Sequence, residues 1–431
     1  MKRNILPLFA LLIMVSLLGC VKPTQKEKRD FDSTRSFSHY YTSVRAAETP
    51  DTIYFLGDTN LYLKYVDKAS GINGVFCGKP ECRHQTKDCN AYLGLIVDAL
   101  FVDSGRLYWI STEFDSRLKD FIYSMALDGT DRRQEAELPE DFIPSGTAAH
   151  RHYVLHDGWL YFGDVSEEIV DGEPILHNYV AAFPLDASQE PLVILREETP
   201  EGGYNNLSIQ FYGGYLYILT NGRSALAGEN ESLYHCRLRR WETKTGELEM
   251  LYEDDKSELN WTSELWVTDD GVIFNRNPTY TQDVPLENRI YKYDFNSGEC
   301  EYLFDNGLYG WANMGLIADN LVTGYQLTNN DNGIYDFYVV LKDFKGNVLV
   351  DETYTLDIRD GYTHYGLFGL SHGIDFLGRD ENYAYYSFYE PSGDDHVSYI
   401  SIVAVALDGS GAKVLCTQTE DQAYRNGGVS P

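Results

Sequence analysis

The chain of 431 residues has few basic residues, few methionines and no long apolar run beyond Leu18. Lysine and arginine number 35 against 66 aspartates and glutamates, so the formal net charge is −31. A body this acidic repels phosphate backbones, which argues against nucleic acid as a partner. The five methionines contrast with 34 tyrosines, 20 phenylalanines and 37 glycines, a composition typical of strands and tight turns rather than helices.

Motifs of several common enzyme classes are missing as well. The chain contains no G-x-x-x-x-G-K-[ST], no H-E-x-x-H and no G-x-G-x-x-G. Residues 369–373 (GLSHG) match G-x-S-x-G, but no hydrolase domain accompanies them, so we interpret them as a connector. No catalytic residue is predicted.

The first twenty residues have the pattern of an export signal that ends in a lipidation site. A basic start is followed by Ile5–Leu18, which is almost wholly apolar, and then by Leu17–Cys20, which resembles the bacterial lipobox. An apolar run of this length is short for a membrane span and suits a signal. Cys20 is therefore predicted to carry a diacylglycerol lipid (palmitate) that anchors the protein to the extracellular face of the cell membrane. The alternatives are a plain signal peptide or a buried N-terminal helix.

The predicted domain organisation follows from this start. Residues 1–19 form the lipoprotein signal peptide, and residues 20–37 form the lipidated cysteine and a flexible tether, because their low hydrophobicity cannot repay ordering entropy. Residues 38–418 form the folded body, and residues 419–431 form a C-terminal tail. No later segment approaches a membrane span, so lipid is the expected anchor.

The body repeats one pattern: a strand, a small turn, an aromatic strand, a loop, a third strand and an acidic turn. The acidic turns are spaced by 61, 58, 56, 52, 49 and 65 residues, and they begin at Asp67, Asp128, Asp186, Glu242, Asp294, Asp343 and Asp408. Seven near-even units of four short strands predict an all-β, seven-bladed β-propeller, with six or eight blades as alternatives. A β-solenoid and two stacked β-sandwiches are the other folds to consider.

Loop lengths distinguish the two faces of such a propeller. The first-to-second and third-to-fourth turns share one face and are uniformly short, whereas the second-to-third loops share the other face and are long, as in residues 164–178 and 326–334. Long loops on a rigid scaffold favour ligand binding. The candidate ligand-binding residues on these loops are Tyr280, Asp283, Asp394, Asp395 and His396.

Three cysteines and one histidine lie close together after the first repeat, at Cys77, Cys82, His84 and Cys89. The spacing C-x4-C-x-H-x4-C supplies four soft ligands, which suit a tetrahedral Zn²⁺ ion. A disulfide is an equal alternative outside the cytoplasm, and free thiols in reducing surroundings are a third. In each case the segment is expected to staple the first two blades together on the long-loop face. Three further cysteines are predicted to be small core residues on separate blades, namely Cys236, Cys300 and Cys416.

Residues 77–84 (CGKPECRH) and 89–91 (CNA), together with the lipobox, carry a resemblance to propeller lipoproteins of Gram-positive anaerobes of the gut. The second blade also resembles YWTD/TolB-like propellers through residues 107–109 (LYW) and 126–129 (ALDG), although Ile110-Ser111 replaces Thr-Asp. The resemblance implies a bacterial surface lipoprotein of propeller fold and no established activity.

These observations favour a lipid-anchored extracellular binding module for a glycan, a peptide or a partner protein. The alternative is a hydrolase or lyase that acts on extracellular polysaccharide, with acidic and tyrosine residues at the channel mouth as general acid and base. A propeller fold alone does not choose between the two.

Overall fold

The computed structural model describes residues 46–56, 62–93, 96–113, 119–138, 152–170, 173–185, 190–199, 206–228, 233–260, 264–278, 289–306, 316–318, 320–331, 334–357, 373–390 and 397–421. Contacts between Cα atoms divide the chain into Met1–Ser33 and Thr34–Pro431, and every described residue lies in the second unit. Cys20 and the tether lie outside the described residues. No helix in the described part of the chain has the length and apolar character that a membrane span requires.

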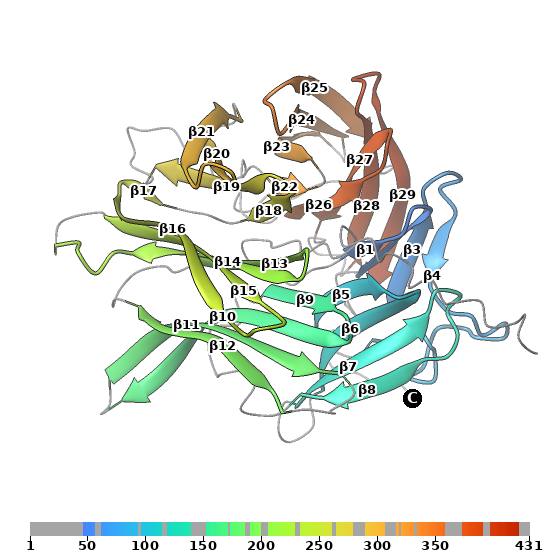
Figure 1. Ribbon diagram of the computed structural model, residues 1–431. Coiled ribbons are helices and arrows are strands. Elements are labelled where there is room, and N and C mark those ends of the chain that lie inside the picture. Colours follow the sequence, from blue (N-terminus) through green and yellow to red (C-terminus); the bar gives the residue numbers. More distant parts are fainter. Residues whose placement is uncertain are drawn as a thin grey trace, which may run out of the picture. The chain divides into compact units, whose positions relative to one another are not determined.

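Seven antiparallel sheets stand in a ring (Figure 1), which confirms the predicted all-β, seven-bladed propeller. Blade one comprises β1 (Ala46–Glu48), β2 (Thr52–Leu56), β3 (Leu63–Asp67) and β4 (Asn73–Val75), and blade two comprises β5 (Ile96–Asp103), β6 (Arg106–Glu113), β7 (Lys119–Ala126) and β8 (Arg133–Glu137). Blade three comprises β9 (His152–His156), β10 (Trp159–Val170), β11 (Glu173–Pro184) and β12 (Leu192–Thr199), and blade four comprises β13 (Asn206–Tyr212), β14 (Tyr215–Arg223), β15 (Tyr234–Glu242) and β16 (Leu248–Ser257). Blade five comprises β17 (Leu259–Asn260), β18 (Leu265–Thr268), β19 (Gly271–Pro278), β20 (Arg289–Asp294) and β21 (Cys300–Asp305). Blade six comprises β22 (Leu316–Ala318), β23 (Leu321–Asp331), β24 (Ile334–Asp343) and β25 (Val348–Asp357). Blade seven comprises β26 (Gly373–Arg379), β27 (Tyr383–Glu390), β28 (Val397–Ala406) and β29 (Ala412–Asp421).

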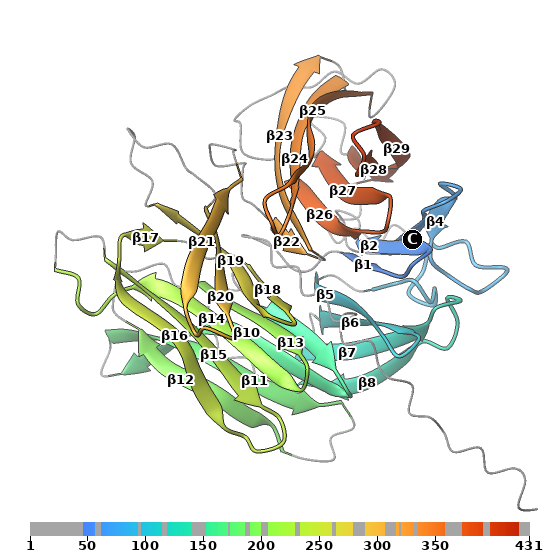
Figure 2. The ribbon, with the colours of Figure 1, turned by 45° about the horizontal axis from the view of Figure 1, so that its top comes forward.

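The first full strand of each blade lies nearest the centre of the ring (Figure 2). Strand β1 contacts β5, β5 contacts β9, β9 contacts β13, β13 contacts β18, and β18 contacts β22. Strand β26 of blade seven contacts β1, so the last blade meets the first. Blades six and seven meet through β25 and β29, so neighbouring blades cover both faces of each sheet, as a propeller requires.

The acidic turns that set the repeat lie between the third and fourth strands, as predicted. In five of them an aspartate Oδ1 accepts a hydrogen bond from a backbone N–H within the turn, and these are Asp67, Asp128, Asp294, Asp343 and Asp408. The Ser70 hydroxyl and N–H hold the pKa of Asp67 below its ordinary value, and Ser410 does the same for Asp408. Asp186 lies outside the described residues.

The strands of blade one show why hydrophobic alternation is weak in this sequence. In β2 (TIYFL), Ile53 and Phe55 pack against blade seven, whereas Tyr54 and Leu56 pack against blade two. All four side chains are buried, because successive side chains of a strand point to opposite faces and both faces are covered. A continuous apolar run is therefore the expected pattern for such a strand.

Two of the predicted long loops are paired strands for most of their length. The β10–β11 ladder continues past Asp164 to the pair Val170↔Glu173, and the β23–β24 ladder continues to Asp331↔Ile334. The interpretation of 164–178 and 326–334 as irregular loops was therefore wrong. A ladder pairs backbone groups whatever the polarity of the side chains, so polar composition alone did not distinguish strand from loop.

One buried carboxyl joins the inner strands of blades five and six. Glu264 precedes β18 and is 5% exposed, and its Oε2 accepts a hydrogen bond of 2.8 Å from the backbone N–H of Ile317 in β22. Its Oε1 is buried without a hydrogen-bond partner among the described residues. Burial raises the pKa of Glu264 well above its usual range, and the Ile317 N–H only partly offsets this effect.

Replacing Glu264 by glutamine is expected to change how stability depends on pH. In the wild type the folded state holds a proton that the unfolded state releases at lower pH, so the free energy of unfolding falls by about 1.4 kcal/mol per pH unit between the two pKa values. Glutamine does not titrate, and its side-chain carbonyl still accepts the Ile317 N–H. Urea denaturation at pH 5 and pH 8 should show Glu264→Gln becoming more stable relative to the wild type as pH rises. The exposed Glu299→Gln serves as the control, and a difference that does not change with pH would contradict the prediction.

Candidate metal centre

The segment that connects blade one to blade two contains the four predicted metal ligands. Residues 76–93, which we call the cysteine segment, run from β4 toward β5 without forming a strand. Three short turns fold it, in which the backbone N–H groups of Cys82, Cys89 and Tyr92 donate to the carbonyl oxygens of Lys79, Thr86 and Cys89 over 3.1 Å each. The Lys79 ammonium group also donates to the Asp88 carbonyl oxygen, which ties the two ends of the loop together.

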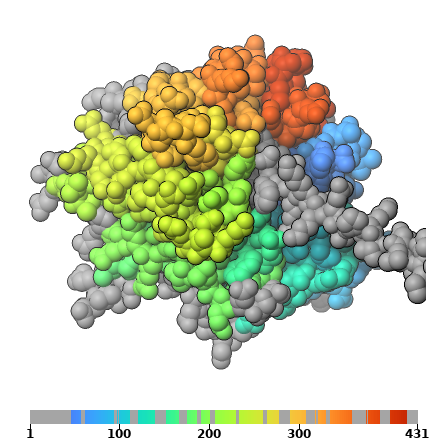
Figure 3. Space-filling view, in the orientation of Figure 1, coloured from blue at the N-terminus to red at the C-terminus, as the bar shows by residue number. Residues whose placement is uncertain are grey.

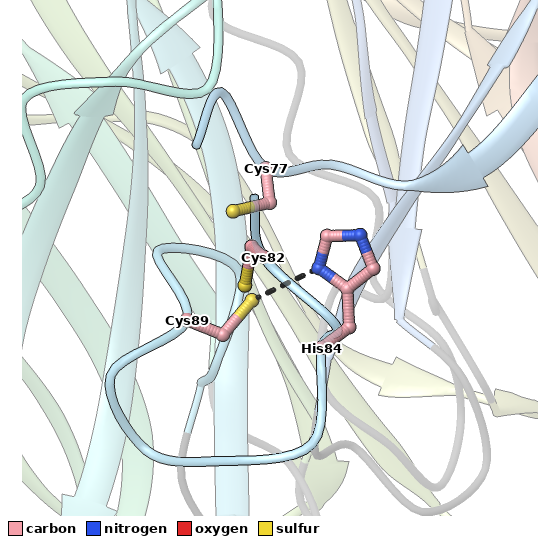
Figure 4. Close-up of side chains that lie close together, drawn as sticks. All are labelled: Cys77, Cys82, His84 and Cys89. Atoms are coloured by element: carbon pink, nitrogen blue, oxygen red, sulfur yellow. Dashed lines mark hydrogen bonds between the residues drawn. The ribbon is translucent and has the colours of Figure 1, made fainter. Parts of the chain in front are cut away.

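The ligand atoms of Cys77, Cys82, His84 and Cys89 all lie within 4.8 Å of one another (Figure 4). His84 Nδ1 is 3.4 Å from Cys89 Sγ. A tetrahedral Zn²⁺ ion, with bonds of about 2.3 Å to sulfur and about 2.1 Å to nitrogen, places neighbouring ligand atoms about 3.5–3.8 Å apart. The structure therefore brings the four predicted ligands together in an arrangement that fits one ion.

The backbone at His84 adopts an uncommon conformation. Its φ is +54°, in the left-handed region that residues other than glycine seldom occupy. Together with the turn on either side, this conformation directs the imidazole toward the three thiols (Figure 4). Strain of this kind persists only where the surrounding structure holds the residue, and it is common at ligand sites.

The thiols of Cys77 and Cys89 differ in how readily they ionise. Burial raises the pKa of Cys77, but hydrogen bonds from the backbone N–H groups of Lys79 and Asn90 and from the other two thiols outweigh it, so the pKa is lowered overall. Burial raises the pKa of Cys89 to about 12. Cys77 is therefore the more readily ionised of these two thiols, and a divalent cation would displace the thiol protons on binding.

The cysteine segment docks directly on blade two. Gly78 N–H donates to the Gly129 carbonyl oxygen over 2.9 Å, and Asn90 Nδ2 donates to the same oxygen over 2.9 Å. The two backbones are so close that a Cβ on Gly129 would lie 2.5 Å from the Gly78 nitrogen. Gly129 belongs to the short β7–β8 turn. We expected the segment on the long-loop face; it bonds there to Leu63 at the start of β3, and it also contacts a turn of the other set through Gly129.

An arginine from blade two completes the contact. Arg132 Nη1 donates to the Cys89 carbonyl oxygen over 3.4 Å, and its guanidinium group lies 5.4 Å from the Trp109 ring and 5.0 Å from the Tyr123 ring. Stacking against these aromatic faces holds the cation beside the segment. Sequence reasoning found the four ligands but missed Arg132, Asn90 and Gly129, because their role depends on contacts between residues far apart in the chain.

The remaining predicted residues are placed as follows. No disulfide joins the six described cysteines. Cys236, Cys300 and Cys416 lie on blades four, five and seven; Cys236 and Cys416 are buried and Cys300 is partly buried, as predicted for small core residues. The candidate ligand-binding residues Tyr280, Asp283, Asp394, Asp395 and His396 lie outside the described residues.

The fold and this site define a seven-bladed β-propeller with a cluster of three cysteines and one histidine after its first blade. No protein-family model and no curated protein sequence matches the chain. Among solved structures, an ulvan lyase of polysaccharide lyase family PL25 is similar, with a TM-score of 0.53 and 12% identity over 93% of this chain and 99% of that chain.

Two further structures extend this similarity. The GH74 enzyme of Niastella koreensis has a TM-score of 0.51 and 12% identity over 89% of this chain and 55% of that chain. An acylaminoacyl peptidase has a TM-score of 0.50 and 10% identity over 93% of this chain and 55% of that chain. The chain thus spans about half the length of these two enzymes, and at such identities the likeness concerns the propeller fold.

Proposed function

We propose that this protein is a lipid-anchored extracellular propeller that binds a glycan, a peptide or a partner protein, with its first blade fixed by a Zn²⁺ ion. The observation that carries the zinc proposal is the convergence of Cys77, Cys82, His84 and Cys89 within 4.8 Å. A disulfide would use two of the three sulfurs and leave the third thiol and the histidine without a shared role. A Zn²⁺ ion uses all four groups.

Charge supports the same proposal. Three thiolates and a neutral imidazole around Zn²⁺ carry a net charge of −1, and Arg132 places a cation beside Cys89. Backbone N–H groups that donate to Cys77 from Lys79 and Asn90 stabilise its thiolate form. Such outer hydrogen bonds orient metal ligands and tune their basicity. The ion would act structurally, because all four positions around it are occupied by protein ligands.

The zinc proposal is tested on protein purified without chelator. Elemental analysis should give about one zinc per chain, and a thiol-specific reagent should react with Cys77, Cys82 and Cys89 only after the metal is removed. Protein without metal in which two of these sulfurs resist alkylation until a reductant is added would instead establish the disulfide. Protein without metal in which all three thiols react at once would establish free thiols.

Lipidation of Cys20 is the second part of the proposal. It is supported by the basic start, the apolar run and the Leu17–Cys20 box. Cells fed labelled palmitate should incorporate the label into the wild-type chain and should lose it with Cys20→Ala, while Cys300→Ala retains it. Equal labelling of the wild type and Cys20→Ala would refute the anchor.

The binding role is supported by the asymmetry of the two faces. Turns between first and second strands are short, with two residues between β5 and β6 and two between β9 and β10. On the opposite side the β10–β11 and β23–β24 hairpins continue the blades as long paired strands. Elements that project from a rigid scaffold are where ligands usually bind. Screening against glycan arrays and peptide libraries should find a ligand whose binding is lost when these hairpins are shortened and kept when a short turn is changed.

The second candidate function is a hydrolase or lyase that acts on extracellular polysaccharide. The observation that favours it is Glu264, whose raised pKa suits a general acid; its carboxyl group is buried in this structure, so the role requires that a substrate gain access to it. Its hydrogen bond to Ile317 gives it a structural role as well. Release of reducing ends or of unsaturated uronates from acidic polysaccharides, abolished by Glu264→Gln without loss of folding, would favour the enzyme over the binding module.

A further inference from the structure

The ring is closed at one place by side-chain contacts without a shared sheet, and these contacts include a hydrogen bond of 3.0 Å from Gln418 Nε2 to Asn73 Oδ1. Blade one consists of the consecutive strands β1–β4 and blade seven of β26–β29, so no described strand from one end of the chain completes the sheet of the other end. We call the contact between these blades the seam. In Figure 3 the blue residues of blade one lie beside the red residues of blade seven, and β1 contacts β26.

The seam is apolar at its centre and polar at its margin. Its core includes Ile53 and Phe55 from blade one and Leu377, Tyr385 and Ile402 from blade seven. No backbone hydrogen bond crosses it between described residues.

A buried lysine lies at the margin of the seam. Lys68 Nζ is 2.6 Å from Glu48 Oε2, 2.9 Å from the Thr49 carbonyl oxygen and 4.9 Å from the centre of the Tyr385 ring. Each side chain of the ion pair is only 6% exposed. The cation therefore joins two parts of blade one and rests on an aromatic ring of blade seven.

Blade one is the smallest sheet of the ring. Its four strands have 3, 5, 5 and 3 residues, whereas those of blade three have 5, 12, 12 and 8. Short strands form few ladder hydrogen bonds, so such a sheet depends on its neighbours for stability. Because alternate residues of β2 face blades seven and two, the position of this strand sets both interfaces at once.

The cysteine segment adds hydrogen bonds to the direct apolar contact between blade one and blade two. Leu63 N–H donates to the Ala91 carbonyl oxygen and Phe76 N–H donates to the Leu63 carbonyl oxygen, each over 2.8 Å, so both ends of the segment are bonded to the start of β3. Gly78 and Asn90, close to its two ends, are both bonded to the Gly129 carbonyl oxygen of blade two. Since the segment has no strand or helix of its own, an ion that joins its four ligands would order it and, through it, blade one.

We infer that metal binding at Cys77, Cys82, His84 and Cys89 controls closure of the propeller ring at the seam. The inference rests on the proposed zinc site. With the ion bound, blade one is held in register on blade two and presents Ile53 and Phe55 to blade seven. Without the ion, blade one moves away from blade two locally and the seam opens, while blades two to six keep their contacts.

Hydrogen exchange of the lipidated protein in detergent tests this inference. Amide exchange is followed by mass spectrometry for the zinc-loaded protein, the chelator-treated protein and the treated protein after addition of ZnCl₂. Removing zinc should speed exchange at least tenfold in peptides of β2 and β27, and zinc should restore protection. Peptides of β10 and β14, which lie in blades three and four, should change little.

Two variants distinguish an effect of losing zinc from an effect of weakening the seam directly. Cys82→Ser should exchange like the chelated protein with or without added zinc. Lys68→Met should keep its zinc and still exchange faster at β2 and β27, because it weakens the seam directly. Zinc binding that leaves the seam peptides unchanged, or loss of protection spread equally over all blades, would overturn the inference while leaving the zinc site in place. Failure to bind zinc at all would refute the proposed site, and the inference with it.

Discussion

Cys82→Ser is expected to lose the bound zinc and to unfold at a lower temperature than the wild type. A serine hydroxyl does not ionise at neutral pH and is a poor ligand for Zn²⁺, so three ligands remain, and we expect the affinity to fall by at least about 100-fold. A ligand present at about 1,000 times its Kd stabilises the folded state by about 4 kcal/mol, and most of this stabilisation should disappear. Elemental analysis after dialysis and thermal denaturation with and without added ZnCl₂ measure both effects.

Cys300→Ser provides the matched control for Cys82→Ser. Cys300 is also partly buried, and its replacement by serine is the same chemical change. It lies on β21 and does not belong to the cluster. It should retain one zinc per chain, and its unfolding temperature should respond to chelator as that of the wild type does. If Cys82→Ser and Cys300→Ser bound zinc equally well, the cluster could not be the metal site.

Gly129→Ala is expected to destabilise the folded state by about 3 kcal/mol. Two costs combine in this variant. Gly129 has a φ of +78°, which costs a residue with a Cβ about 1–2 kcal/mol. The new methyl group would also lie 2.5 Å from the Gly78 nitrogen, and overpacking against backbone costs about 1–3 kcal/mol. Urea denaturation followed by tyrosine and tryptophan fluorescence measures the sum.

Gly105→Ala isolates the first of these costs. Gly105 lies in the same blade with a nearly equal φ of +76°, but a Cβ there would meet no atom within 4 Å. Its destabilisation should be only about 1 kcal/mol. The difference between the two variants therefore reports the contact between the cysteine segment and blade two. Equal losses would mean that the contact is absent in solution.

The repeat and the ligand set could be predicted because their causes are local. An aspartate that accepts a backbone N–H two or three residues later closes a turn without help from the rest of the fold, as Asp67 and Asp128 do. The same holds for Cys77, Cys82, His84 and Cys89, which meet through three short turns of one segment. Patterns of this kind can be recognised in sequence alone.

Features that depend on tertiary contacts could not be predicted in this way. Gly129 meets Gly78 across 51 positions of sequence, and nothing near Gly129 marks it as different from Gly105. The extension of β10 and β11 depends on the pairing of two polar stretches with each other. Likewise, Ile53 and Tyr54 could be assigned to opposite blades only after the order of blades around the ring was known.

The order of the strands within each blade determines when that blade can fold. Every described sheet is built from strands that follow one another in sequence, so each can form as soon as its own residues emerge from a ribosome or an export channel. Blade one must then wait, with its apolar residues Ile53 and Phe55 uncovered, until some 330 later residues have been delivered. The earliest sheet to fold is thus the last to gain its second neighbour. During that interval, its contact with blade two must protect it from aggregation.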